Sequence, residues 1–379
     1  MSEKISIERL NMAALNADYY QLWTDMRAQN LSLYSPYFHP EYSQFVGSLQ
    51  GDAYVSIIRK GGDIVGFLPF QQRKKKSSAR PIGAPMTDYH GIISARPLPF
   101  SMEEILTGSD ISAFQMASQM NRPVHNDNEA VDEATCAVMN LSDFETIEDW
   151  RASRDSSYRR HLKSLRRRIK KTETEHGPRR FIWQSTSEDH FDQLIEWKKQ
   201  KFSDTGKYDV LGVDWTLQLL KNLWRRGPNA PLRCDLHVMM INNQPAAMDL
   251  GLTDGITFHS WIVGYDNQFH SLSPGMQLLE MLINQMPNLG YQNIDLGSGL
   301  DGYKKHYASW PHMATNALWL GRGIGSNTAK LYSKIEHMGR DRLKDLPGKF
   351  RRRYTQISAC DPSLSGQTRA MWHAIKNGG

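Results

Sequence analysis

Residues 257–304 read TFHSWIVGYDNQFHSLSPGMQLLEMLINQMPNLGYQNIDLGSGLDGYK, and their pattern decides the expected fold. The β-branched and aromatic residues from Thr257 to Val263 favour a strand. Ser273 is a good helix N-cap, and Pro274 suits the first helical position because no intrahelical N–H bond is needed there. Apolar residues then recur at helical spacing, and residues 294–296 form a short apolar strand before a glycine-rich turn. The stretch therefore predicts strand, loop, helix and strand in succession.

The start of the predicted helix has the features of an anion site. The amides of Gly275, Met276 and Gln277 are expected to lack intrahelical partners, and the helix dipole adds partial positive charge there. Gly275 also lets a ligand approach the backbone closely. Such an end can hold a phosphate or pyrophosphate, although most helix starts of this kind bind only water. The neighbouring strands and the polar turn after residue 296 favour the anion site.

The motifs combine in a way that resembles the GNAT acyltransferases, which bind acyl-CoA between two splayed strands. The resemblance rests on Tyr265-Asp266, on Ser273-Pro274-Gly275 followed by two leucines, on Asp295-x-Gly-x-Gly and on Tyr303-Lys304. This form is similar to the CelD/BcsL-type acetyltransferases of exopolysaccharide synthesis, which are related to the Fem-type aminoacyl transferases. The usual GNAT pyrophosphate loop is Gln/Arg-x-x-Gly-x-Gly/Ala. Its positions here are His270, Ser273 and Gly275, and only Gly275 is retained.

The resemblance implies an α/β, GNAT-like acyl-CoA N-acyltransferase fold with two tandem GNAT-like halves and a C-terminal helical extension. Hairpin patterns at residues 55–69 and 237–251 share length and spacing, which indicates an internal repeat. We expect a degenerate, acceptor-side half at 1–142, an acetyltransferase domain at 143–325 and a basic helical extension at 326–379. The cofactor is expected in the second half only, because the first has no Ser-Pro-Gly helix start.

Composition limits the class of protein. The chain has 379 residues, a formal net charge of +6 and three widely separated cysteines. The charge suits anionic ligands or an anionic membrane surface, and the cysteines favour a reducing compartment. The N-terminus is polar, and no apolar run approaches the roughly 18 residues that span a bilayer. These features predict a soluble cytoplasmic protein, with the inner face of the membrane as a second location.

Two other classes of site are rejected. Residues 297–302 spell GxGxxG, but no acidic residue occurs between Asp301 and Glu336, where a dinucleotide-binding site requires one. Histidines occur singly, and no metal-binding motif is present, so no metal is expected.

Acyl transfer needs a proton acceptor and donors for the oxyanion. Backbone amides from Val263 to Tyr265 would serve the oxyanion in a GNAT-like site. His259 and Asp295 are the candidate general bases, since each lies on a strand that would flank the thioester. A strand histidine can instead be a buried packing residue, and an aspartate can cap the glycine-rich turn. The expected acyl-CoA contacts are Val263, Tyr265, Ser273, Pro274, Gly275, Met276 and Gln277.

Tyr303 and Lys304 are two further catalytic candidates. In Fem-type relatives, a lysine at a similar place is implicated in handling phosphate or transition-state charge. The resemblance implies that Lys304 holds an anionic acceptor or stabilises charge; without it, Lys304 would be an exposed lysine in a Lys-Lys-His run. Asp88, Tyr89, His90 and Trp261 are expected acceptor contacts, although such residues often pack or cap turns.

Residues 158–171 form an amphipathic basic helix in the sequence pattern. Such a run is usually a solvated face, but it could contact anionic lipid or a tRNA backbone. The run carries no aromatic residue after Tyr158, and no heptad stretch for a Fem-type coiled coil is present. This favours acyl-CoA over aminoacyl-tRNA, so nucleic acid is not the expected partner.

By resemblance, we expect an acetyl-CoA-dependent N-acetyltransferase that acts on an amino sugar of an exopolysaccharide or cell-surface polysaccharide precursor. Its acceptor would be a saccharide or lipid-linked saccharide. The alternatives are a Fem-type aminoacyl-tRNA-dependent transferase onto a peptidoglycan precursor and a non-catalytic GNAT scaffold.

Overall fold

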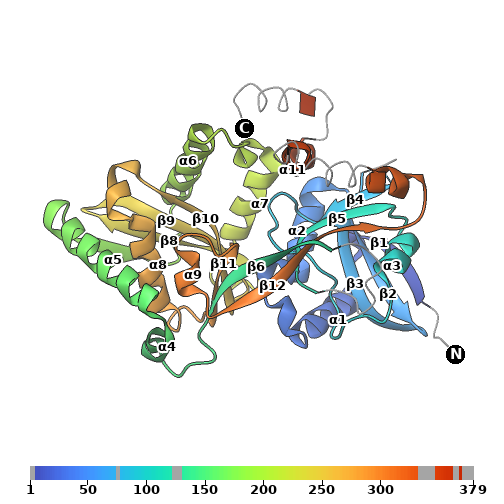
Figure 1. The fold of residues 1–379 in the computed structure, drawn as a ribbon, viewed down its shortest axis with the longest axis horizontal. Coiled ribbons are helices and arrows are strands. Elements are labelled where there is room, and N and C mark those ends of the chain that lie inside the picture. Colours follow the sequence, from blue (N-terminus) through green and yellow to red (C-terminus); the bar gives the residue numbers. More distant parts are fainter. Residues whose placement is uncertain (1–4, 74–76, 122–129, 332–345, 362–366, 369–379) are drawn as a thin grey trace. The chain divides into compact units, whose positions relative to one another are not determined.

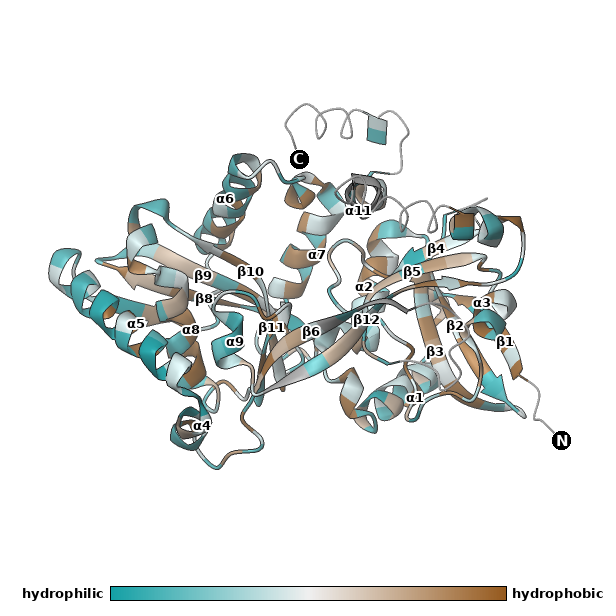
Figure 2. Ribbon diagram, in the orientation of Figure 1, coloured by the Kyte–Doolittle hydropathy of each residue, from teal (hydrophilic) through white to brown (hydrophobic). Residues whose placement is uncertain are grey.

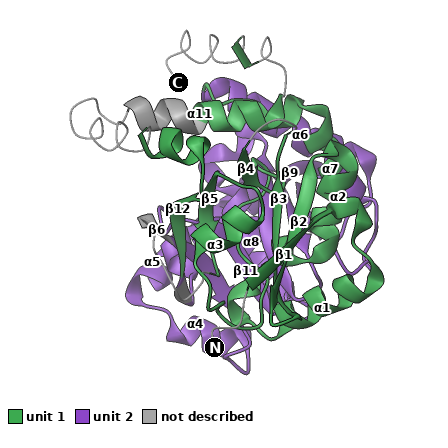
Figure 3. Ribbon diagram, turned by 90° about the vertical axis from the view of Figure 1, so that its right-hand side faces the viewer, with its two compact units in different colours: residues 1–134, 206–219, 313–379 green, residues 135–205, 220–312 purple. Residues whose placement is uncertain are grey.

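The computed structural model describes residues 5–73, 77–121, 130–331, 346–361 and 367–368 (Figure 1). The chain divides into two compact units (Figure 3). Unit 1 contains Met1–Ala134, Gly206–Leu219 and Met313–Gly379, and unit 2 contains Thr135–Thr205 and Leu220–His312. These units differ from the expected ranges 1–142, 143–325 and 326–379, because residues 206–219 and 313–325 group with unit 1.

Unit 1 is built on a mixed β-sheet with the order β1-β2-β3-β4-β5-β12. Within it, β4 and β5 are parallel, and the other neighbouring pairs are antiparallel. Its strands are β1 (Ile5–Asn11), β2 (Ala53–Lys60), β3 (Asp63–Gln71), β4 (Ser78–Pro81), β5 (Ala113–Gln119) and β12 (Trp310–Leu320). Its helices are α1 (Ala17–Ala28), α2 (Pro40–Gln50), α3 (Met102–Gly108) and α11 (Leu346–Cys360). Phe70, Phe114 and Trp319 are buried in its core.

The strands of unit 2 neighbour one another in the order β6-β11-β10-β9-β8-β7. Its strands are β6 (Ala130–Asn140), β7 (Arg179–Ile182), β8 (Arg233–Ile241), β9 (Gln244–Thr253), β10 (Thr257–Tyr265) and β11 (Asn293–Ser298). Its helices are α4 (Ile147–Ser153), α5 (Ser156–Glu175), α6 (Glu188–Asp204), α7 (Asp214–Trp224, shared with unit 1), α8 (Pro274–Gln285) and α9 (Lys304–Tyr307). The parallel pair is β10 and β11, as the strand–helix–strand pattern of residues 257–304 predicts.

The two units repeat one topology. Unit 1 runs β1-α1-α2-β2-β3-β4-α3-β5, and the chain from β7 onward runs β7-α6-α7-β8-β9-β10-α8-β11 in the same order. In each case, the last two strands are the parallel pair, with one helix between them. The predicted hairpins are β2–β3 and β8–β9, and their turns use positive φ at Gly61-Gly62 and at Asn242-Asn243. The internal repeat expected from the hairpins is therefore confirmed, and it extends to β1–β5 in unit 1 and β7–β11 in unit 2.

The apolar face of α8 packs on the sheet of unit 2. Leu279, Leu282 and Ile283 lie in one buried cluster with Ile294 and Leu296 of β11, as the helical spacing predicts. Figure 2 shows that α5, in contrast, is predominantly hydrophilic. Its buried positions are Tyr158, Leu165 and Thr172, seven residues apart, so a single side of α5 faces the unit.

The C-terminal region has helical segments at residues 324–331 and in α11. The remainder of the extension predicted at 326–379 lies largely outside the described residues. Among the described helices, none combines the length and apolar character required to cross a bilayer.

Candidate functional site

The parallel strands β10 and β11 pair over three residues and then separate. Thr257, Phe258 and His259 pair with Asn293, Ile294 and Asp295, respectively. Beyond this point, β10 continues to Tyr265 and β11 to Ser298 without a further pair in the register between them. The two strands thus form a V-shaped opening whose closed end is the pair His259–Asp295.

The opening coincides with a β-bulge in β10. The register of β10 against β9 shifts between Ser260 and Ile262, so that the half-buried Trp261 is the extra residue. Bulges of this kind bend a strand and re-aim its side chains, and they are common beside functional sites. The predicted oxyanion positions Val263 and Tyr265 follow the bulge, and the carbonyl of Val263 accepts a hydrogen bond from Lys198 Nζ at 3.4 Å.

Asp249 of β9 lies directly behind this part of β10. Its Oδ2 accepts a hydrogen bond of 2.7 Å from the Ser260 hydroxyl, and Val263 is its partner in the strand register. The Asp249 side chain is buried, and its Oδ1 has no hydrogen-bond partner among the described residues. Burial raises the pKa of Asp249 to about 7, although Ser260, His259 and Lys198 each oppose that rise. Asp249 is therefore a carboxyl group that changes protonation state near neutral pH.

His259 and Asp295, the predicted general bases, lie side by side with no exposed surface. His259 Nδ1 and Asp295 Oδ2 are 3.3 Å apart, and Asp295 Oδ1 accepts a hydrogen bond of 2.8 Å from the Gly297 amide. The second contact is the turn-capping role weighed for Asp295 in the sequence. In this structure, neither side chain has surface from which to contact an acceptor.

Ser273 begins α8 in a different way from the prediction. It occupies the N-cap position, as predicted, but it adopts a left-handed backbone conformation with φ 55°, and its side chain makes no capping hydrogen bond. Its hydroxyl instead accepts a hydrogen bond of 2.8 Å from Arg168 Nη1 of α5. A guanidinium therefore lies at the N-terminus of α8, where the helix dipole also favours an anion.

The first amides of α8 are only partly available. Those of Met276 and Gln277 donate to the Ser273 carbonyl at 3.1 and 3.2 Å, so the prediction that they lack intrahelical partners is wrong. The Gln277 side chain is buried, and its Nε2 donates to Thr172 Oγ1 and to the Leu272 carbonyl, each at 3.0 Å. Pro274 occupies the first helical turn, as predicted. A side chain built at Gly275 would meet nothing within 4 Å, so the space beside this residue is open.

The equivalent helix of unit 1 has a closed N-terminus. At the start of α3, Ser101 and Glu104 form a capping box, and the Glu104 carboxylate accepts hydrogen bonds from the Ser101 amide and hydroxyl. That carboxylate opposes an anionic ligand, whereas the first turn of α8 contains no acidic residue. The residues at the start of α8 fit a phosphate group, and those of α3 do not.

Tyr303 and Lys304 follow the glycine-rich turn after β11. The Tyr303 side chain is 38% exposed, and its pKa is raised by burial and secondly by the charge of Asp249. Tyr303 therefore lies within electrostatic reach of Asp249. Lys304 Nζ donates to the Ser298 carbonyl at 2.9 Å, which ties the lysine to the end of β11.

The predicted acceptor contacts are divided between the units. Trp261 belongs to unit 2, while Asp88, Tyr89 and His90 belong to unit 1. Asp88 is exposed, but Tyr89 and His90 are buried, and burial lowers the His90 pKa to about 4. Their joint role in acceptor binding stays a prediction.

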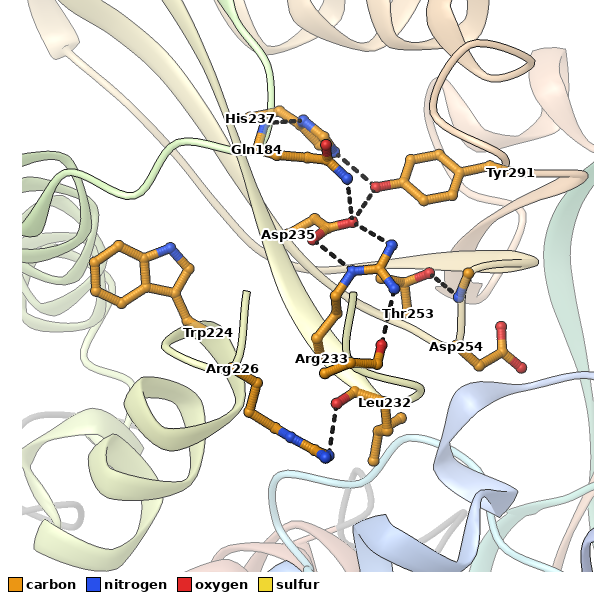
Figure 4. Close-up of polar contacts among 12 residues, drawn as sticks. Gln184, Trp224, Arg226, Leu232, Arg233, Asp235, His237, Thr253, Asp254 and Tyr291 are labelled. Atoms are coloured by element: carbon orange, nitrogen blue, oxygen red, sulfur yellow. Dashed lines mark hydrogen bonds and ion pairs between the residues drawn. The ribbon is translucent and has the colours of Figure 1, made fainter. Parts of the chain in front are cut away.

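A second buried polar cluster in unit 2 is saturated by its own hydrogen bonds (Figure 4). Arg233 contacts both carboxylate oxygens of Asp235, at 3.0 and 3.1 Å. Asp235 also accepts hydrogen bonds from Gln184 and Tyr291, and the Tyr291 hydroxyl reaches His237. Because these groups satisfy one another, the cluster stabilises β8 and its neighbours and is not the candidate site.

Sequence reasoning missed Asp249, Ser260 and Arg168. The available signal for Asp249 was an acidic residue inside the apolar strand Ala246–Leu252, since charged residues are rarely buried without a reason. Among the described residues, no group of three or more His, Cys, Asp or Glu side chains is arranged to hold a metal.

Residues 156–305 match the family described as Acetyltransferase (GNAT) domain. This segment runs from α5 to the start of α9 and includes the separated strands. A crystal structure of FemX, 9% identical, covers 86% of this chain and 99% of its own length, with a TM-score of 0.51. A tandem GNAT protein from the clavulanic acid biosynthesis pathway, 10% identical, covers 83% and 97%, with a TM-score of 0.42. No curated protein matches the chain. The predicted GNAT-like α/β fold is confirmed.

Proposed function

We propose that this protein transfers an acetyl group from acetyl-CoA to the amine of an amino sugar in a polysaccharide precursor. The observation that carries the proposal is the separation of β10 from β11 immediately after His259 and Asp295, beside an open helix start at Gly275. The match of residues 156–305 to a GNAT acetyltransferase domain supports the acyl-transfer class. The amino-sugar acceptor comes from the resemblance to the CelD/BcsL-type enzymes.

Three features of unit 2 would hold acetyl-CoA. The open space at Gly275 admits a phosphate to the start of α8, where the Arg168 guanidinium adds positive charge. The main chain of β10 beyond the bulge, from Val263 to Tyr265, would contact the thioester as hydrogen-bond donor and acceptor. Acetyl-CoA held in this way would have its acetyl group beside Ser260, near the closed end of the opening between β10 and β11.

In this proposal, His259 and Asp295 have a structural role and take no part in the chemical step. Because both are buried at the last strand pair, they fix where β10 and β11 part, and hence how wide the opening is. Tyr303, which keeps exposed surface beyond β11, is placed to give a proton to the departing thiolate. Lys304 fixes the turn that carries Tyr303.

The acceptor is proposed to be lipid-linked, because α5 presents a cationic strip. All exposed cations of this helix lie on the side opposite Tyr158, Leu165 and Thr172, and no acidic residue occurs from Ser156 to Thr172. The strip consists of Arg159, Arg160, Lys163, Arg166, Arg167, Lys170 and Lys171. Clusters of four to eight Lys and Arg residues are typical of surfaces that bind anionic lipid. We therefore propose peripheral contact with the inner face of the membrane.

The strip also favours the second candidate, a Fem-type transfer from aminoacyl-tRNA, because a cationic helix can bind a nucleic-acid backbone. A transfer assay separates the two. Purified protein is incubated with acetyl-CoA and a panel of amino sugars, starting with glucosamine, and released CoA thiol is measured. Acceptor-dependent CoA release supports the proposal. Failure of every amino sugar, together with salt-sensitive tRNA binding, would replace it with the Fem-type function.

A further inference from the structure

Asp249 is a buried carboxyl group, and only one of its two oxygens accepts a hydrogen bond among the described residues. Oδ2 accepts the Ser260 hydrogen bond at 2.7 Å, whereas Oδ1 has no hydrogen-bond partner among the residues that the structure describes. The side chain is 5% exposed. An ionised carboxylate in such a place is costly unless it is paired, so the site favours a carboxyl group that readily takes up a proton.

Ser260 connects this carboxyl group to the opening between the strands. It is the first residue of β10 after the last pair with β11, and it borders the bulge at Trp261. Unlike Asp249, Ser260 is only half-buried. Its hydroxyl donates to Asp249, so the oxygen keeps lone pairs for a proton that arrives from the opening.

The charged and titratable groups around Asp249 come from four elements. Lys198 of α6 and His259 of β10 favour its ionised form. Tyr291, before β11, and Tyr303, after it, have their own pKa values raised by the Asp249 charge. Burial outweighs these effects and raises the Asp249 pKa to about 7, which suits a proton acceptor at neutral pH.

Building on the proposed function, we propose that Ser260 and Asp249 form the proton relay that deprotonates the acceptor amine. As the amine nitrogen bonds to the thioester carbonyl carbon, its proton passes to Ser260 Oγ. Ser260 simultaneously gives its own proton to Asp249 Oδ2. The carbon–sulfur bond then breaks, and the thiolate takes a proton from Tyr303. Asp249 returns its proton through Ser260 to solvent, and Tyr303 takes one proton from solvent, so the acylation of a neutral amine releases no net proton.

The relay uses a different proton acceptor from the two candidate general bases, His259 and Asp295, that sequence reasoning selected. His259 and Asp295 have no exposed surface and contact each other, whereas Ser260 has both surface and a buried partner. Because Ser260 passes the proton on, Asp249 can accept it while remaining buried. In contact with water, the pKa of Asp249 would fall to the ordinary aspartate range.

Kinetics of the variants test the relay with acetyl-CoA and the amino sugar that the wild type turns over. Asp249→Asn should lower kcat by about 100-fold or more, a general-base effect, while the KM for acetyl-CoA changes little. Wild-type kcat should fall below about pH 7, and this acid limb should disappear in Asp249→Asn. Ser260→Ala should be impaired, whereas Ser260→Thr, which retains a hydroxyl, should keep most of the activity. Asp192→Asn, at an exposed position of α6, is the control.

A measurement that needs no turnover follows the carboxyl group itself. If Asp249 titrates near pH 7 in the folded state, Asp249→Asn should gain stability relative to the wild type at pH 8, and the gain should shrink toward pH 5. An acid limb that persists unchanged in Asp249→Asn belongs to the substrate amine or to another group, and would overturn the relay. Wild-type protein that transfers no acetyl group to any amino sugar would overturn the proposed function instead.

Discussion

His259 and Asp295 face each other at the last paired position of the parallel strands β10 and β11, with Nδ1 and Oδ2 3.3 Å apart and no exposed surface on either residue. One residue further, the strands have parted. The pair is thus the closed end of the opening that the proposed function uses. Its location explains why a histidine and an aspartate are fully buried within these strands.

Asp295→Ala should destabilise unit 2 and widen the opening. The substitution leaves the buried Gly297 amide without its acceptor and His259 without its carboxylate. Each unsatisfied buried polar group costs about 1–3 kcal/mol, so we expect the free energy of unfolding to fall by about 2–5 kcal/mol in urea titrations. Asp295→Asn is the matched control, because its amide oxygen can still accept from Gly297. Equal stability of Asp295→Ala and wild type would show that the pair does not hold the strands.

Arg168→Ala should weaken acetyl-CoA binding without unfolding the protein. Arg168 donates to Ser273 at the N-terminus of α8, where a phosphate would contact the guanidinium. A charged hydrogen bond contributes about 1.5–3 kcal/mol, which corresponds to a roughly 10- to 100-fold rise in Kd measured by calorimetry. Arg167→Ala, on the exposed side of the same helix, should bind as the wild type does. Equal losses in both variants would indicate a diffuse charge effect and no phosphate contact.

Acidification should destabilise the protein through His237. Burial lowers the His237 pKa to about 4 in the folded state, while the ordinary value is 6.5. Between these values the unfolded chain binds one more proton than the folded one, so stability is lost as pH falls from 6.5 toward 4. The maximal slope is about 1.4 kcal/mol per pH unit, readable from urea unfolding at several pH values. His237→Asn should be less stable at pH 7 and show a flatter slope. An unchanged slope in His237→Asn would mean that other titratable groups cause the loss of stability at acidic pH.

The cationic strip of α5 should bind anionic vesicles. Arg166→Glu with Arg167→Glu should abolish sedimentation with phosphatidylglycerol vesicles, because each cation near such a surface contributes about 1 kcal/mol. Lys201→Glu with Lys207→Glu changes the net charge equally at other exposed positions and should retain binding. Two outcomes would contradict a dedicated lipid surface. One is a protein that binds tRNA and does not sediment with the vesicles, and the other is a control pair that also loses sedimentation.

Local signals accounted for the parts of the fold that sequence predicted. The β-branched run at Thr257, Pro274 at a helix start and the apolar spacing through Ile283 each act over a few residues, and the structure has all three elements. The β8–β9 turn at Asn242-Asn243 is equally local, since few residues tolerate positive φ.

The missed features depend on contacts that the sequence does not encode locally. Arg168 and Ser273 are 105 positions apart and meet because α5 packs beside the start of α8. Asp249 and Ser260 meet across the β9–β10 register, and a bulge sets that register. Ser273 has the composition of a cap, but the left-handed backbone turns its hydroxyl toward Arg168, so composition alone predicted the wrong partner.

The central claim is that acetyl-CoA binds between β10 and β11 with a phosphate at the start of α8. A thermal melt with and without acetyl-CoA tests it directly, because a ligand at about 100 times its Kd stabilises the folded protein by about 2.7 kcal/mol. We predict a clear rise in Tm for the wild type and for Gln200→Trp, an exposed control on α6, and no rise for Gly275→Trp, whose indole would fill the open space. An equal rise in Gly275→Trp would contradict the proposed location, and no rise in the wild type would contradict acetyl-CoA as the donor.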